Sequence, residues 1–235
     1  MARGKAVVMN QVTWGILVTC GKNEQLVSGI DISYLDLAGK AVLSYSLQAF
    51  EQSHEIAGVV VVSAPERVEQ TLGICQLFGF SKVRKVVPGA ATFFGSVQHA
   101  LKVLAEDVQM VCMHGAGRPC IQTALVSDVV KAARKEGAAA AGAPIGNLLM
   151  ATGKGDVIKE VVDASALWSL QSPSACRLDW LQQALASAAK KKDHPENIVD
   201  VLGLIKKSVK LIANPRPNIQ LRQPTDLMMA VALSS

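Results

Sequence analysis

Continuous apolar runs alternate along this chain with segments in which apolar residues recur every three or four positions. The runs are typical of buried strands, and the periodic segments are typical of helices. We expect strands over residues 13–21, 56–65, 82–89, 108–115, 138–146 and 209–215. We expect helices over residues 41–53, 66–79, 96–107, 122–137, 179–193 and 224–235. This alternation predicts a three-layer α/β fold, in which helices cover both faces of a mainly parallel sheet.

The pattern weakens between residues 146 and 163, where short mixed segments replace the long runs. We interpret this stretch as an excursion from the main sheet. The chain shows no internal repeat, linker or low-complexity tract. We therefore expect residues 1–235 to form a single domain, with an arm at 146–163.

The predicted strand ends indicate where a ligand site should lie. Ligands of open α/β sheets bind outside the carboxyl ends of the strands. Those ends fall here at residues 19–21, 63–65, 88–89 and 114–118. The last of them lies in "MHGAGRPC", a corner that contains a histidine, an arginine and a proline but no carboxylate.

The charges and cysteines of the chain indicate which kinds of ligand, metal site and cross-link to expect. The formal net charge is +5, but the charges are scattered. Scattered positive charge suits an anionic small molecule better than nucleic acid, and it is equally compatible with a basic protein that binds neither. The five cysteines form no CxxC pair, which argues against a disulfide framework and a zinc site. No run of residues indicates a signal peptide or a membrane span, so we expect a cytoplasmic protein with no membrane partner.

Four motifs, in order, give the chain a family resemblance. "PGAATFFGSVQHAL" is similar to GGxxRxxSVxNGL, "MHGAGRPC" to HDAARP, "ALWSLQSP" to LWxxQTP and "NIQLRQPTDL" to NIKxTxPEDL. Together they resemble the methylerythritol phosphate cytidylyltransferases of the non-mevalonate isoprenoid pathway. Members of that family join CTP to 2-C-methyl-D-erythritol 4-phosphate and release pyrophosphate. The resemblance implies a Rossmann-like nucleotidyltransferase fold, with an arm that pairs with its twin in a homodimer.

The resemblance also implies which residues are left from a nucleotide site. These are Gly21, Lys22, Gly89, Ser96, His114, Gly115 and Arg118. The family's phosphate-handling and metal-side positions carry other residues here, namely Asn23, Gln25, Ile32, Phe93, Gly115, Ala164 and Gln220. Arg222 lies two residues after Gln220, on the same face of an extended segment, and is the candidate replacement for a lost lysine.

Several of the retained residues also have purely structural interpretations. Ser96 and Gly89 suit helix capping and turn formation. His114 and Arg118 suit a hydrogen-bond network at the end of a strand. Trp168 suits a core or dimer contact better than a stacking platform, and we assign no catalytic residue.

We expect a cytidylyltransferase homologue with weak or no catalysis, a pseudoenzyme that retains at most weak binding of CTP or another anionic small molecule. Catalysis of phosphoryl chemistry rests on positioning and on cations, and the replaced residues are of that type. One alternative is an active cytidylyltransferase with relocated cations, which would use Mg²⁺. Another is a structural subunit that partners an active paralogue.

Overall fold

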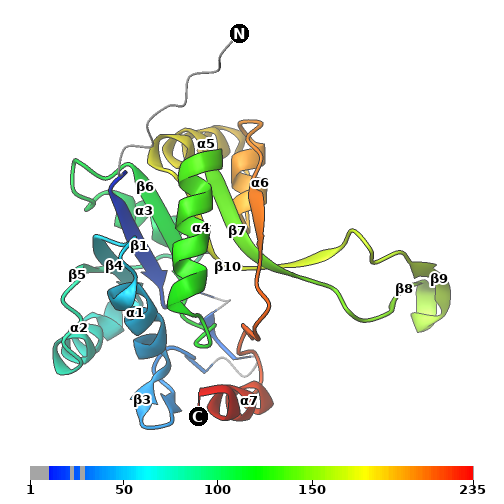
Figure 1. The fold of residues 1–235 in the computed structure, drawn as a ribbon, viewed down its shortest axis with the longest axis horizontal. Helices are drawn as coiled ribbons and strands as arrows, with labels where there is room; N and C mark the ends of the chain where they lie inside the picture. Colours follow the sequence, from blue (N-terminus) through cyan, green and yellow to red (C-terminus); the bar gives the residue numbers. More distant parts are fainter. Residues whose placement is uncertain (1–10, 22–23, 27–29, 235) are drawn as a thin grey trace.

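A computed structural model describes residues 11–21, 24–26 and 30–234 of the chain (Figure 1). Its central sheet has seven strands in the order β11-β7-β10-β6-β1-β4-β5. Every neighbouring pair is parallel except the two that involve β10, which is antiparallel to both β6 and β7. The predicted α/β fold with a mainly parallel sheet is therefore confirmed. The strands are β1 (Thr13–Val18), β4 (Gly58–Ser63), β5 (Val83–Pro88), β6 (Met110–Gly115), β7 (Ala138–Pro144), β10 (Trp168–Arg177) and β11 (Lys210–Ala213).

Helices pack on both faces of this sheet. The apolar cluster on one face includes residues of α1, α2 and α4, and the cluster on the other face includes residues of α3, α5 and α6. The helices are α1 (Val42–Gln52), α2 (Val68–Leu77), α3 (Phe93–Leu101), α4 (Thr123–Glu136), α5 (Leu178–Lys191), α6 (Ile198–Gly203) and α7 (Pro224–Ser234). The described residues also include the short 3-10 turns η2 (Pro65–Arg67), which precedes α2, and η3 (Lys154–Asp156), and a small hairpin of β2 (Asp36–Leu37) and β3 (Lys40–Ala41), which precedes α1.

The β4 strand shows why continuous apolar runs form this sheet. All six of its residues are buried. Val59 and Val61 pack into one apolar cluster, and Val60 packs into the other. Successive strand side chains point to opposite faces, so a strand covered by helices on both sides needs apolar residues at every position.

β10 and α6 are among the elements that were not predicted from the sequence. β10 contains Gln171, Ser172 and Pro173, and its pairing with β7 shifts register between Leu170 and Ser174. Such an interrupted, partly polar segment has neither the apolar run nor the alternation that marks a strand. The six-residue α6 is also new, and the side chain of Asn197 caps its amino end.

One predicted boundary was wrong in a way that affects the site. α3 begins at Phe93, three residues before the expected start at Ser96. The hydroxyl of Thr92 accepts a hydrogen bond from the Gly95 amide at 3.1 Å, so Thr92 is the residue that caps the helix. Ser96 consequently lies within the first turn of the helix.

The stretch between β7 and β10 leaves the body of the molecule. It contains an antiparallel hairpin of β8 (Leu149–Thr152) and β9 (Ile158–Val162), which Figure 1 shows projecting well away from the sheet. In the part of the chain that the structure describes, no helix is long and apolar enough to cross a membrane.

Candidate functional site at the carboxyl ends of the strands

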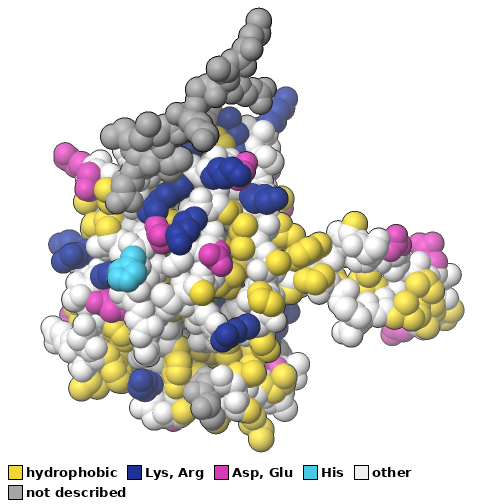
Figure 2. All heavy atoms as spheres, in the orientation of Figure 1, with side chains coloured by type: hydrophobic (Ala, Val, Ile, Leu, Met, Phe, Trp, Pro, Cys, Tyr) yellow, Lys and Arg dark blue, Asp and Glu magenta, His cyan; other side chains and the backbone are white. Residues whose placement is uncertain are grey.

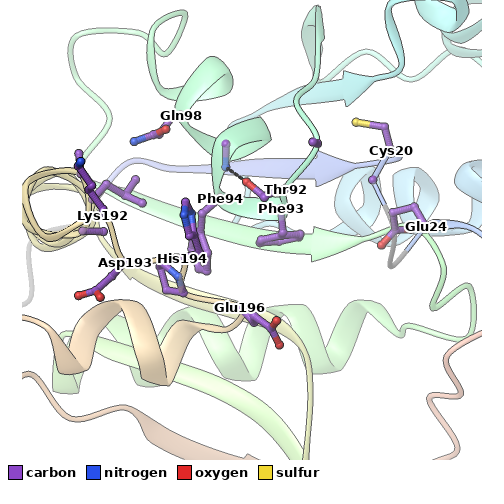
Figure 3. Close-up of a pocket in the computed structure, with 17 residues that line it drawn as sticks. Cys20, Glu24, Thr92, Phe93, Phe94, Gln98, Lys192, Asp193, His194 and Glu196 are labelled. Atoms are coloured by element: carbon purple, nitrogen blue, oxygen red, sulfur yellow. Dashed lines mark hydrogen bonds between the residues drawn. The ribbon is translucent and has the colours of Figure 1, made fainter.

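Two cavities lie where β1, β5 and β6 end. The first has a volume of about 610 Å³ and the second about 660 Å³. Both are lined by Glu24, Phe93, Phe94 and Glu196, so they share a boundary. Figure 3 shows Phe93 and Phe94 between Glu24 on one side and His194 and Lys192 on the other.

The loop after β5 closes one end of the first cavity. A Cβ added to Gly89 would collide with the Cys20 sulfur and would lie 3.0 Å from the Ser96 hydroxyl oxygen. The Ser96 hydroxyl in turn accepts a hydrogen bond from the Ala90 amide at 2.9 Å. Gly89 and Ser96 therefore pack and hold this loop. Cys20 lines the cavity beside them.

The second cavity contains the end of β6 and the segment before α7. Gly115, Arg118, Gln220 and Arg222 all line it. The Arg118 guanidinium donates a 2.5 Å hydrogen bond to the Asn218 carbonyl oxygen. Burial, together with the nearby charge of Arg222, lowers the pKa of Arg118 to about 10, so Arg118 stays cationic at neutral pH.

His114 is fully buried in a hydrogen-bond network. Its Nε2 lies 3.2 Å from the Arg118 carbonyl oxygen, and its Nδ1 lies 2.8 Å from the Ser172 hydroxyl. A carbonyl oxygen can only accept, so Nε2 carries the proton and Nδ1 accepts from Ser172. Burial lowers the pKa of His114 to about 3. This neutral imidazole ties β6 to β10 and does not line either cavity.

Glu24 is a site residue that the sequence did not reveal. Its side chain is 3% exposed, and Oε2 accepts a 2.5 Å hydrogen bond from the Gly117 amide. A Cβ on Gly115 would collide with Oε1. Burial raises the pKa of Glu24 to about 8, so its carboxyl group is mostly protonated at neutral pH. The corner that lacks an acid in its own sequence thus receives one from the loop after β1.

Ile32 does not face the cavities. It is fully buried in an apolar cluster with Leu26, Leu37, Val42 and Leu221. A lysine at this position would place an ammonium group in an apolar environment, which is strongly unfavourable. The resemblance implies a phosphate-binding lysine at position 32, and Ile32 supplies no cation there.

The remaining predicted residues are placed as follows. Gly21 lines the first cavity and has φ +99°, a conformation that favours glycine. Lys22 and Asn23 lie outside the described residues. Trp168 is 39% exposed at the start of β10, so it is not a core residue, and its interpretation as a dimer contact stays a prediction.

The corner does not suit Mg²⁺. Mg²⁺ in phosphate-transfer sites is usually held by one or two free carboxylates together with substrate phosphates. The carboxyl group of Glu24 is protonated at neutral pH and already hydrogen-bonded to Gly117. Among the described residues, no three His, Cys, Asp or Glu side chains come together in a group that could hold a metal ion.

Comparisons with known proteins point to one family. The family model described as "IspD: 2-C-methyl-D-erythritol 4-phosphate cytidylyltransferase" matches residues 14–234. A relative of that name from Pelotomaculum thermopropionicum is 30% identical over 93% of this chain and 92% of its own length. Another from Salinibacter ruber is 31% identical over 93% and 91%. The crystal structure of the Thermus thermophilus enzyme of that name superimposes with a TM-score of 0.79 at 24% identity, covering 95% of this chain and 99% of its own.

Proposed function

We propose that this chain, which belongs to the 2-C-methyl-D-erythritol 4-phosphate cytidylyltransferase family, is a homologue with little or no cytidylyltransferase activity. Its nucleotide site is rebuilt with groups that do not bind a triphosphate. The observation that carries the proposal is the burial of Ile32, at a position where the family resemblance expects a phosphate-binding lysine.

The energetics of the reaction make such losses severe. Attack on the α-phosphorus of CTP depends on groups that position the phosphates and neutralise their charge. Loss of one preorganised group of this kind typically costs about 10²–10³ in rate. Position 32 has an apolar side chain, and the glycine at position 115 has no side chain. Losses within one site are not additive, yet two of them still predict a rate reduced by at least about 10².

An active enzyme with relocated cations is the second candidate, and one observation favours it. Arg118 and Arg222 both line the second cavity, where they could contact a phosphate. However, Arg118 already donates to the Asn218 carbonyl, which orients its guanidinium toward the protein. Arg222 therefore remains the better candidate for a replacement cation.

Calorimetric titration with CTP and Mg²⁺ tests the proposal directly. We expect no binding in the low-micromolar range, because a triphosphate would have to be held with few cations. A low-micromolar dissociation constant would contradict the proposal. Loss of that affinity in the Arg222→Gln variant, with a fold unchanged by circular dichroism, would establish the relocated-cation alternative instead.

We also propose that residues 1–235 act as one domain and that two chains pair through the arm at 146–163. Leu148, Val157, Ile158 and Val161 are each more than 60% exposed there. Figure 2 shows hydrophobic side chains at the tip of the arm and along its neck. Apolar side chains gathered on a projecting hairpin suit burial against a second copy.

A further inference from the structure

A buried carboxyl group in contact with a backbone amide is unusual where a phosphate site is expected. Backbone N–H groups at strand ends and tight turns are the usual donors to phosphate oxygens. The Gly117 N–H is such a donor, and it is directed at Oε2 of Glu24. One oxygen of this carboxyl group therefore already fills the position in which the Gly117 amide would meet an oxygen of a bound anion.

We propose that the Glu24 carboxyl group occupies an oxyanion subsite at Gly115–Gly117, and that a phosphate-bearing ligand binds there only after it expels Glu24. The proposal deepens the proposed function, because it names the group that keeps a phosphate from this corner. It also explains Gly115, since any side chain at that position would collide with Glu24.

Expulsion of Glu24 has space available because Glu24 lines both cavities. Its carboxyl group lies within range of the charges of Arg118 and Asp31. Glu196 and Arg222 line the same second cavity. Once in water, a carboxyl group that was protonated when buried loses its proton. Anion binding at pH 7 should therefore release a proton from Glu24.

Variants of this pair test the proposal with inorganic pyrophosphate as the probe. Glu24→Ala frees the Gly117 amide, whereas Glu196→Ala removes an acidic residue from the same two cavities without touching that amide. We expect Glu24→Ala to bind pyrophosphate at least about tenfold more tightly than wild type, the value of one charge-assisted hydrogen bond. We expect Glu196→Ala to change the affinity by less than about threefold.

Gly115→Ala, added to Glu24→Ala, tests whether the gained affinity comes from this corner, because its methyl group would take up the space that the Glu24 carboxyl leaves. Its control is Gly73→Ala, where an added Cβ meets nothing within 4 Å. In the Glu24→Ala background we expect Gly115→Ala to remove the gain in pyrophosphate affinity and Gly73→Ala to leave it unchanged. Glu24→Ser also removes the carboxyl group from the Gly117 amide, and it takes the place of Glu24→Ala if that variant does not fold.

Glu24→Gln keeps a hydrogen-bond acceptor of the same size, so it should bind pyrophosphate no better than wild type. Titrations of wild type in two buffers of different ionisation enthalpy should show proton release beyond that of Glu24→Ala. The proposal is overturned if Glu24→Ala binds pyrophosphate no better than Glu196→Ala, if the added Gly115→Ala leaves the gain intact, or if Glu24→Gln gains as much as Glu24→Ala. Turnover of CTP by wild type would contradict the proposed function but not this result.

Discussion

The carboxyl group of Glu24 shows how burial sets the protonation of a single residue. Its pKa rises from 4.5 to about 8 mainly because the charged form would lose its hydration. The hydrogen bond from Gly117 and the charge of Arg118 act in the opposite direction and are outweighed. The folded protein therefore holds this proton more tightly than the unfolded chain does.

The first prediction concerns stability against pH. A raised carboxyl pKa stabilises the fold below pH 4.5, and this stabilisation is lost as pH rises to about 8. His114 acts in the opposite direction between pH 3 and 6.5, so the range above pH 6.5 isolates Glu24. There the free energy of unfolding should fall by up to about 1.4 kcal/mol per pH unit. Urea denaturation of wild type and Glu24→Gln measures this slope, and parallel pH profiles would contradict the assignment.

The second prediction concerns the pair formed by Gly115 and Glu24. Gly115→Asp forces a second carboxyl group into the space that Glu24 fills, which should cost at least about 2 kcal/mol of stability. Adding Glu24→Ala should recover part of the loss, with a coupling energy of about 1 kcal/mol or more in a double-mutant cycle. Strict additivity would show that the two positions do not share one space. Gly73→Asp, in open surroundings, serves as the control.

At the scale of residues, the sequence shows that the corner after β6 lacks a carboxyl group, but it does not show that Glu24 supplies one. The absence of an acid in "MHGAGRPC" is visible from the letters alone. The contact of Glu24 with this corner cannot be seen in the sequence, because Glu24 and Gly117 are 93 residues apart and only the fold brings them together. A glycine in the family's acidic position, with a glutamate in the first loop, is the signal that could have been used.

At the scale of elements, prediction succeeded where one physical cause dominates. β4 and β6 are buried along their full length, so their sequences are continuously apolar. α4 ends at Gly137 with φ +90°, as the expected glycine stop requires. β10 escaped prediction because its pairing with β6 and β7 is decided by tertiary contacts rather than by its own pattern.

The third prediction tests the start of α3, which lines the first cavity. Thr92 accepts a hydrogen bond from the Gly95 amide, an otherwise unsatisfied donor at the amino end of the helix. Thr92→Ala should lower the free energy of unfolding by about 1 kcal/mol, and Thr92→Ser should retain most of it. Equal urea midpoints for Thr92→Ala and wild type would show that the cap adds nothing.

At the scale of the whole molecule, the arm and the body have different surfaces. The body buries its apolar residues in two clusters on either side of the sheet. The arm hairpin instead exposes Val157, Ile158 and Val161. Hydrophobic periodicity predicts the body, because burial there is internal to the chain. The arm has no apolar core of its own, so its sequence has no regular spacing of apolar residues. The sequence therefore showed only that the regular spacing stops there.

The fourth prediction follows from that exposed surface. Ile158→Asp should shift the protein from dimer to monomer in sedimentation velocity, because a charge would be buried at the proposed contact. Leu77→Asp changes an equally apolar residue, 78% exposed on α2, and should leave the dimer intact. A monomeric wild type, or a dimer that survives Ile158→Asp, would rule out pairing through this face of the arm.

The central claim is that the family fold is kept here while its transferase chemistry is largely lost. Pyrophosphate release from CTP and 2-C-methyl-D-erythritol 4-phosphate, in the presence of Mg²⁺, measures this most directly, with the Pelotomaculum thermopropionicum relative as the reference. We predict a rate at least about 10²-fold below the reference for the folded wild-type protein. A rate within tenfold of the reference would contradict the account.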